Sequence, residues 1–131
     1  MPIEMQQHDD HDIVIHHAEG ALTSDQIQSE MEKFFETCPN KDAIWDFTNA
    51  DMKAITREDM ERLYGFLAAN ASKRDGGRTA FVAQNDLEFG LSRMAEMLTD
   101  SLPYERRTFR SIEEAIAWLA DDALPPAEIE P

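Results

Sequence analysis

Three groups of polar side chains follow the apolar runs that we expect to form the strands of a sheet. They are Asp46, Thr48, Asn49 and Asp51 in the first group, Gln84 and Asp86 in the second, and Arg110 and Ser111 in the third. If the strands run parallel, all three groups meet at one edge of the sheet, where open α/β sheets bind ligands. With Thr56 they form the predicted recognition rim, suited to contact a partner or accept a phosphoryl group. The alternative is that residues such as Asn49, Asp86 and Ser111 are turn and cap residues.

Asp46 is the rim residue with the most unusual position, because it interrupts the apolar run Ile44–Phe47. An unpaired carboxylate in such a strand is costly. Either it lies just past the buried part of the strand, or it finds a partner such as Arg110 or backbone N–H groups as a structural tie, or it is a catalytic base. The sequence places no histidine, serine–base pair or metal ligand beside it, so the structural tie is favoured. We therefore predict no catalytic residue and no enzyme activity.

The segment from His8 to Asp12 contains two histidines and three aspartates, a ligand set that suits zinc or nickel. We interpret it as an exposed hairpin turn, since it is not held on a rigid element. His16 and His17 are neighbours in a strand and should point to opposite faces. The single cysteine, Cys38, can form neither an internal disulfide nor a cysteine-based metal site, and we expect it to be buried near a helix end. The sequence thus predicts no metal and no cofactor.

A candidate apolar patch comprises Phe89, Met94 and Met97. Phe89 and Met97 are eight residues apart, about two helical turns, and so share one side of a helix. The patch is interpreted as a lip over an apolar cleft, as a surface that packs on a partner, or as part of a wide inner face.

The elements that position these residues alternate along the chain. They are a hairpin over residues 3–17, a helix from Thr23 or Ser24 to about 37, a strand over 44–47, a polar loop over 48–56, a helix from Thr56, a strand over 79–83, a helix capped by Asn85 and Asp86, a strand over 105–109 and a helix from Ser111. The inner face of the third helix should consist of four apolar residues, Leu87, Leu91, Met94 and Leu98.

The order β-β-α-β-α-β-α-β-α predicts an α/β fold. We expect a mixed, mostly parallel sheet of about five strands flanked by four helices. Residues 1–120 should form a single domain, and residues 121–131 an acidic, proline-containing flexible tail.

The composition narrows the classes of partner. The chain has 131 residues and a formal charge of −15, which disfavours nucleic acid and anionic membrane surfaces. No apolar run approaches the ~20 residues that cross a bilayer, and the N-terminus lacks the pattern of a secretory signal. We therefore expect a cytoplasmic protein with no integral membrane segment.

Several segments, taken together in this order, resemble the SpoIIAA-like group, small bacterial proteins related to STAS domains. They are Glu19-Gly20-Ala21-Leu22-Thr23, Ile44-Trp45-Asp46-Phe47, Thr79-Ala80-Phe81-Val82-Ala83, Phe89-Gly90 with Arg93-Met94, and Phe109-Arg110-Ser111 with Glu114 through Leu119. The resemblance covers about residues 13–119 and implies a mixed sheet flanked by helices. STAS antagonists are switched by phosphorylation of a serine in an Asp-Ser-Ser-Gly-like turn. The matching residues 54–57 lack that motif, with Thr56 as the only hydroxyl.

Two functions follow as expectations. The first is a non-enzymatic regulatory or protein-interaction module that uses the recognition rim to bind a protein partner or a second copy of itself. The alternative is a protein that binds a small apolar ligand or lipid between helices and sheet, as some SpoIIAA-like and Sec14-type proteins are thought to do.

Overall fold

The computed structural model describes residues 3–8, 13–37, 41–73, 77–98 and 105–120. Three sequence predictions concern residues outside these ranges. They are the metal-binding alternative at His8–Asp12, of which residues 9–12 lie outside, the burial of Cys38, and the flexible tail over residues 121–131.

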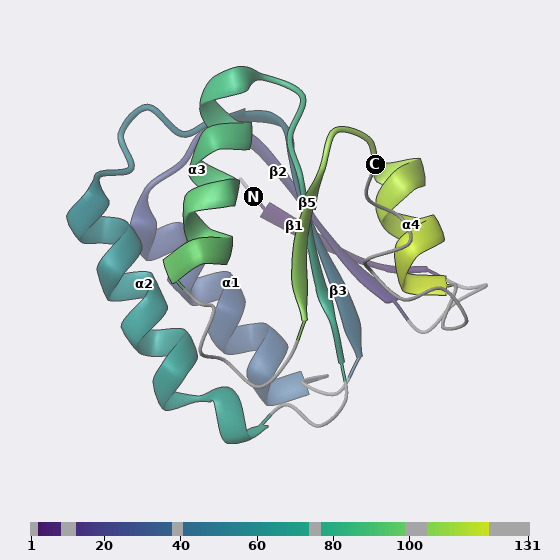
Figure 1. The fold of residues 1–131 in the computed structure, drawn as a ribbon. Coiled ribbons are helices and arrows are strands. Elements are labelled where there is room, and N and C mark those ends of the chain that lie inside the picture. Colours follow the sequence, from purple (N-terminus) through teal and green to yellow (C-terminus); the bar gives the residue numbers. More distant parts are fainter. Residues whose placement is uncertain (1–2, 9–12, 38–40, 74–76, 99–104, 121–131) are drawn as a thin grey trace.

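One five-stranded sheet forms the centre of the domain, and its strands lie side by side in sequence order (Figure 1). The strands are β1 (Ile3–His8), β2 (Ile13–Ala21), β3 (Asp42–Asp51), β4 (Thr79–Val82) and β5 (Arg106–Phe109). β1 pairs antiparallel with β2, and the other neighbours pair in parallel. The predicted α/β class, with a mixed and mostly parallel sheet, is confirmed.

Three helices cover one face of this sheet and the fourth covers the other (Figure 1). α1 (Ser24–Thr37), α2 (Arg57–Ala69) and α3 (Asp86–Leu98) connect the successive parallel strands, while α4 (Ile112–Ala120) follows β5. Right-handed crossovers that always step in the same direction across a sheet leave their helices on the same face. A three-helix layer on one side is therefore a consequence of the strand order. A short 3-10 turn, Ala71–Lys73, follows α2.

The side chains of β3 alternate between the two faces, as a strand covered on both sides requires. Trp45 and Phe47 pack beneath the three-helix layer, and Ile44 packs with α4. The strand continues to Asp51, so the polar loop predicted from Thr48 is wrong: residues 48–51 belong to β3. The reason is non-local, because Asn49, Ala50 and Asp51 pair with the end of β2.

The end of β2 differs from the prediction for the same reason. The sequence predicted a hairpin that ends at residue 17, but the strand reaches Ala21 after a register shift between His17 and Glu19. Gly20 has φ +72°, a conformation that other residues rarely adopt, and glycine permits the chain to keep pairing there.

The starts of α1, α2 and α4 follow the predicted capping signals. The Gln26 N–H donates to Thr23 Oγ1 at 3.2 Å, and the Glu114 N–H donates to Ser111 Oγ at 3.2 Å. Thr56 and Asp59 form a complete capping box at α2. These hydroxyls satisfy backbone donors that would otherwise lack partners at each helix start.

Candidate functional site

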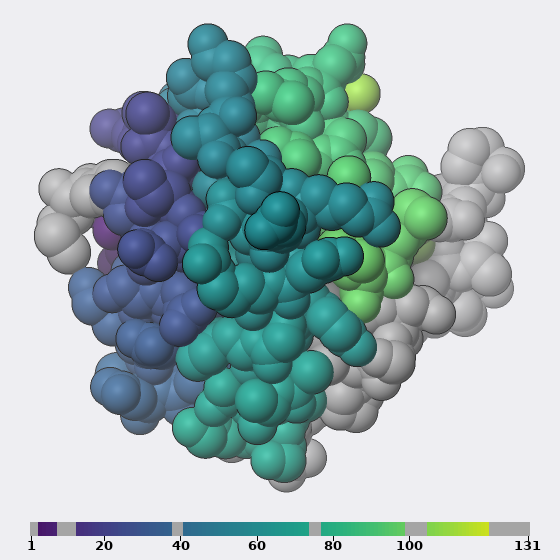
Figure 2. Space-filling model, turned by 90° about the vertical axis from the view of Figure 1, so that its left-hand side faces the viewer, coloured from purple at the N-terminus to yellow at the C-terminus, as the bar shows by residue number. Residues whose placement is uncertain are grey.

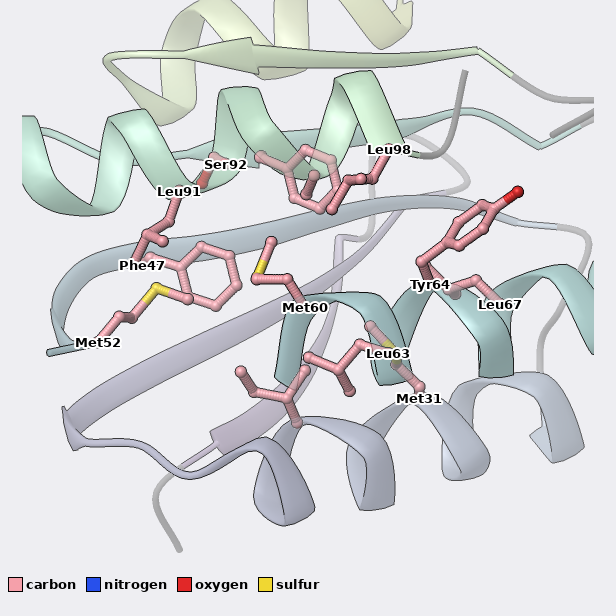
Figure 3. A pocket seen from close by; sticks show the side chains of 13 residues that line it. Met31, Phe47, Met52, Met60, Leu63, Tyr64, Leu67, Leu91, Ser92 and Leu98 are labelled. Atoms are coloured by element: carbon pink, nitrogen blue, oxygen red, sulfur yellow. The ribbon is translucent and has the colours of Figure 1, made fainter. Parts of the chain in front are cut away.

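An apolar cavity lies between the three-helix layer and the sheet (Figure 3). Its volume is about 50 Å³. Its lining comes from α1, β3 and the turn after it, α2, β4 and α3, through the side chains of Ile27, Met31, Phe47, Met52, Met60, Leu63, Tyr64, Leu67, Phe81, Leu91, Ser92, Ala95 and Leu98. We call this the methionine-lined cavity. It is larger than the ~10–15 Å³ that one water occupies.

The lining divides into a buried floor and a half-exposed mouth. The residues from α1, the two strands and the turn at Met52 are buried. The half-exposed lining residues all belong to α2 and α3: Tyr64, Leu67, Leu91, Ala95 and Leu98. Figure 2 shows the side chains of α2 over the middle of this face, between those of α1 and α3. The exposed part of the lining therefore comes from α2 and α3.

Three methionines from three different segments line the cavity: Met31 on α1, Met52 after β3 and Met60 on α2. Methionine has an unbranched, flexible and polarizable side chain that adapts to irregular spaces. None of the lining residues is charged. The chemistry of the lining thus suits contact with hydrocarbon.

Two polar side chains of α3 are buried beside the cavity, and the sequence analysis missed both. Glu88 is 4% exposed and Ser92 is 3% exposed, whereas Leu87 is 46% exposed. The predicted inner face is therefore wrong at Leu87, and the helix turns Glu88, Leu91, Ser92, Ala95 and Leu98 inward. Their spacing of three or four residues was visible in the sequence, but two polar members hid it.

Glu88 has a defined structural role. Its Oε2 accepts a hydrogen bond of 3.1 Å from the Met52 N–H, in the turn that joins β3 to α2. This bond fixes the turn against α3 and holds Met52 at the cavity wall.

A polar cluster joins the N-terminal ends of α1 and α2 beside the cavity. Ser24 Oγ donates to Asp59 Oδ1 at 3.2 Å, and the Arg62 guanidinium donates to both. The Thr56 N–H donates to Asp59 Oδ2 at 3.0 Å. This backbone hydrogen bond, followed by the Thr56 and Ser24 hydroxyls and Arg62, lowers the pKa of Asp59. The cluster holds the two helices together at this end.

Most of the recognition rim consists of residues that bond to the protein itself. Thr56 and Ser111 cap helices. Arg110 donates to the Gln84 carbonyl at 2.7 Å and lies 3.2 Å from the Asp86 carboxylate, which is 97% exposed. The rim residues that follow β4 and β5 do lie together, as expected for the ends of parallel strands. Arg110 and Ser111 form hydrogen bonds with backbone groups of the protein itself.

Asp46 has different partners from those expected. Its Oδ2 lies 3.0 Å from His17 Nδ1, and its Oδ1 accepts hydrogen bonds from the N–H and hydroxyl of Thr48, at 3.1 and 2.6 Å. The backbone tie is confirmed, but the tie to Arg110 and the absence of a neighbouring histidine are wrong. The Nε2 of His17 lies 2.8 Å from Gln6 Oε1. Gln6, His17, Asp46 and Thr48 are thus linked to one another by hydrogen bonds, and none of these four side chains is an unpartnered nucleophile.

The remaining rim residues lie at the end of β3. Asn49 is exposed, and the Asp51 carboxylate accepts a 3.0 Å hydrogen bond from the Lys53 N–H. Because β3 runs beyond the end of β4, these two side chains stand away from Gln84 and Asp86 along the strand direction.

The candidate apolar patch does not form one surface. Phe89 is half-buried, and its ring lies beneath the Arg110 guanidinium at 3.8 Å. Met94 packs against the core, whereas Met97 is 75% exposed. None of the three lines the methionine-lined cavity.

A second buried polar pair, also missed in the sequence, lies beneath α1. His16 is fully buried, its Nδ1 lies 2.9 Å from Glu30 Oε2, and its ring stacks on Trp45 with centroids 4.1 Å apart. The opposite orientation of His16 and His17 is confirmed, since their partners lie on opposite faces. Among the described residues, no three histidine, cysteine, aspartate or glutamate side chains gather as a metal site.

Comparisons with known proteins leave the family open. No protein-family model matches this chain, and comparison with curated proteins gives no significant match. Within the described residues, no helix has the length and apolar character needed to span a bilayer. The resemblance to the SpoIIAA-like group stays a prediction, and function has to be argued from the geometry of the cavity and rim.

Proposed function

We propose that this protein binds a small apolar molecule in the methionine-lined cavity. The observation that carries the proposal is a cavity whose lining is hydrocarbon, thioether and aromatic, apart from the Ser92 and Tyr64 hydroxyls. Protein interiors contain few voids larger than a water molecule. A water needs two to four polar partners, and this lining offers too few, so the space favours an apolar occupant.

The size of the cavity sets the kind of ligand. A volume of about 50 Å³ accommodates a few heavy atoms, and typical ligand pockets hold several hundred Å³. A longer ligand therefore requires the half-exposed side chains of α2 and α3 to move apart. The flexible methionines of the floor lower the cost of such adjustment. We propose a binding function without a chemical step.

The three lining methionines provide a direct test. In protein carrying carbon-13-labelled methionine methyl groups, titration with 2-hexanone should shift the signals of Met31, Met52 and Met60 saturably. The exposed Met5 and Met97 serve as internal controls and should not shift. Assignment by single Met→Leu variants identifies each signal. Titration that shifts only the two exposed methionines, or none, would contradict the proposal.

A regulatory interaction through the rim is the second proposal, supported by the exposed Asn49 and the partly exposed Asp51 carboxylate at the end of β3. A pull-down from cell lysate should then recover a partner that Asp51→Lys no longer binds. Equal recovery by both proteins would contradict this use of the rim.

A further inference from the structure

Ser92 is the polar residue of the cavity whose hydrogen bonding is incomplete. Its Oγ is buried and has no hydrogen-bond partner within the described structure. A serine in a helix often donates to the carbonyl four residues earlier. That bond is absent here, although Glu88 occupies the position. Buried hydroxyls without partners are rare and costly, so the group calls for a physical explanation.

The other hydroxyl of the lining belongs to Tyr64, at the mouth. Figure 3 shows the Tyr64 hydroxyl pointing away from the remaining lining side chains. Ser92, in contrast, belongs to the buried part of the lining. Ser92 is therefore the hydrogen-bonding side chain in the buried part of the lining.

The charges around Ser92 limit the ligand's own charge. The lining contains no lysine, arginine or histidine. One helical turn before Ser92, the buried Glu88 carboxylate is held by the Met52 N–H. An anionic group at Ser92 would be buried near this carboxylate without a compensating cation, which is strongly unfavourable.

We infer that the ligand is a neutral molecule with one oxygen function, a ketone, aldehyde, ester or alcohol, that hydrogen-bonds to Ser92 Oγ. A serine hydroxyl donates to a carbonyl and also accepts from an alcohol, so it serves each of these groups. This inference rests on the proposed function, since it requires an occupied cavity. It adds the ligand's polar group and its charge.

The positions on α3 give the ligand's orientation. Ser92 and Leu98 both line the cavity, and six residues of helix separate them by roughly 9 Å. The oxygen end lies at Ser92, and the hydrocarbon extends along α3 toward Leu98 and Tyr64.

The test compares six-carbon probes that differ in one group: hexane, 2-hexanone, 1-hexanol and, at pH 8, hexanoate. Their affinities are measured from the labelled methionine methyl signals for the wild type, Ser92→Ala and the control Ser29→Ala, whose serine is exposed on α1. Ser92→Ala should weaken the binding of 2-hexanone and 1-hexanol roughly fivefold to tenfold, because one hydrogen bond is lost. Hexane affinity should stay within twofold, and Ser29→Ala should change nothing.

Each outcome separates the inference from the proposed function. If hexane and 2-hexanone bind and both are indifferent to Ser92→Ala, the apolar site stands and the hydrogen-bond inference is overturned. If hexanoate binds as tightly as 2-hexanone, the inference that the ligand is neutral is wrong. If no probe binds the wild type, the proposed function fails with it. An unfolding midpoint of Ser92→Ala at or above that of the wild type shows that its losses reflect binding.

Discussion

The recognition rim and the methionine-lined cavity differ in how they use their polar atoms. The rim has nine polar residues, but its hydroxyls, carboxylates and guanidinium mostly bond to the protein's own helix starts, turns and side chains. The cavity is almost wholly apolar, yet its one deep hydroxyl has no partner among the described residues. This comparison shows that a high density of polar residues at the ends of strands reflects helix caps and turns. Unfilled space and an unpaired buried group are better indications of a ligand site.

The strand order bears on where a ligand crevice can form in this sheet. Ligand crevices in open α/β sheets form where the strand order reverses and adjacent helices go to opposite faces. Here β2, β3, β4 and β5 follow one another without reversal. The three connecting helices consequently gather on one face, and the space between them and the sheet becomes the place for a ligand.

The largest effect on stability is expected at the cavity wall. Leu63→Ala should lower the free energy of unfolding by about 2–4 kcal/mol, because Leu63 is buried and its truncation enlarges the space around it. Urea denaturation measures the loss. The control Leu87→Ala, on the exposed side of α3, should stay within about 0.5 kcal/mol of the wild type. Equal losses in the two variants would mean that Leu63 is not part of a packed wall.

A smaller loss is expected at Glu88. Glu88→Leu leaves the buried Met52 N–H without its acceptor and should cost about 1–3 kcal/mol. Glu88→Gln retains an acceptor oxygen and should cost less than half as much. The same denaturation experiment distinguishes them, and a Gln variant as unstable as the Leu variant would contradict the role given to this hydrogen bond.

Substitution in the rim should affect stability and leave binding unchanged. Thr56→Ala removes the capping hydroxyl of α2 and should cost about 1 kcal/mol. The affinity for 2-hexanone should remain within twofold of the wild type. A larger drop in affinity would remove the distinction between a structural rim and a binding cavity.

The smallest effect is expected in acid, at Asp59. Its pKa is lowered from the ordinary value of 3.8, mainly by the Thr56 N–H, so the carboxylate stabilises the folded protein above that value. This contribution is lost as the pH falls through the folded-state pKa. The stability difference between wild type and Asp59→Asn should therefore shrink from pH 7 toward pH 3 in urea denaturation. A constant difference would contradict the lowered pKa.

The sequence predicted what depends on local signals. Helical periodicity and capping residues such as Thr56 and Ser111 located the helices, and alternating elements predicted the α/β class. Features that depend on non-local register were missed: β3 continues to Asp51 because β2 pairs with it, and His17 lies beside Asp46 for the same reason.

The cavity itself could not have been predicted from the sequence. Met31, Met60 and Leu63 appear as ordinary core residues in their helical stripes. Whether their side chains fill the space depends on the distances between three helices and a sheet. Glu88 and Ser92 gave the one available signal, polar residues at inward spacing on α3.

The most direct test of a ligand site under the helical layer is a substitution that fills the mouth of the methionine-lined cavity. Ala95→Phe places a ring among the half-exposed lining residues, and Ala68→Phe makes the same change on the exposed side of α2. Urea denaturation shows whether each variant retains the fold. Ala95→Leu, a smaller enlargement at the same position, serves as a second variant if Ala95→Phe is destabilised. In titrations with 2-hexanone followed by the methionine methyl signals, Ala95→Phe should bind at least roughly tenfold more weakly than the wild type, and Ala68→Phe should bind equally well. Equal affinity in all three proteins would contradict the assignment of the cavity as the binding site.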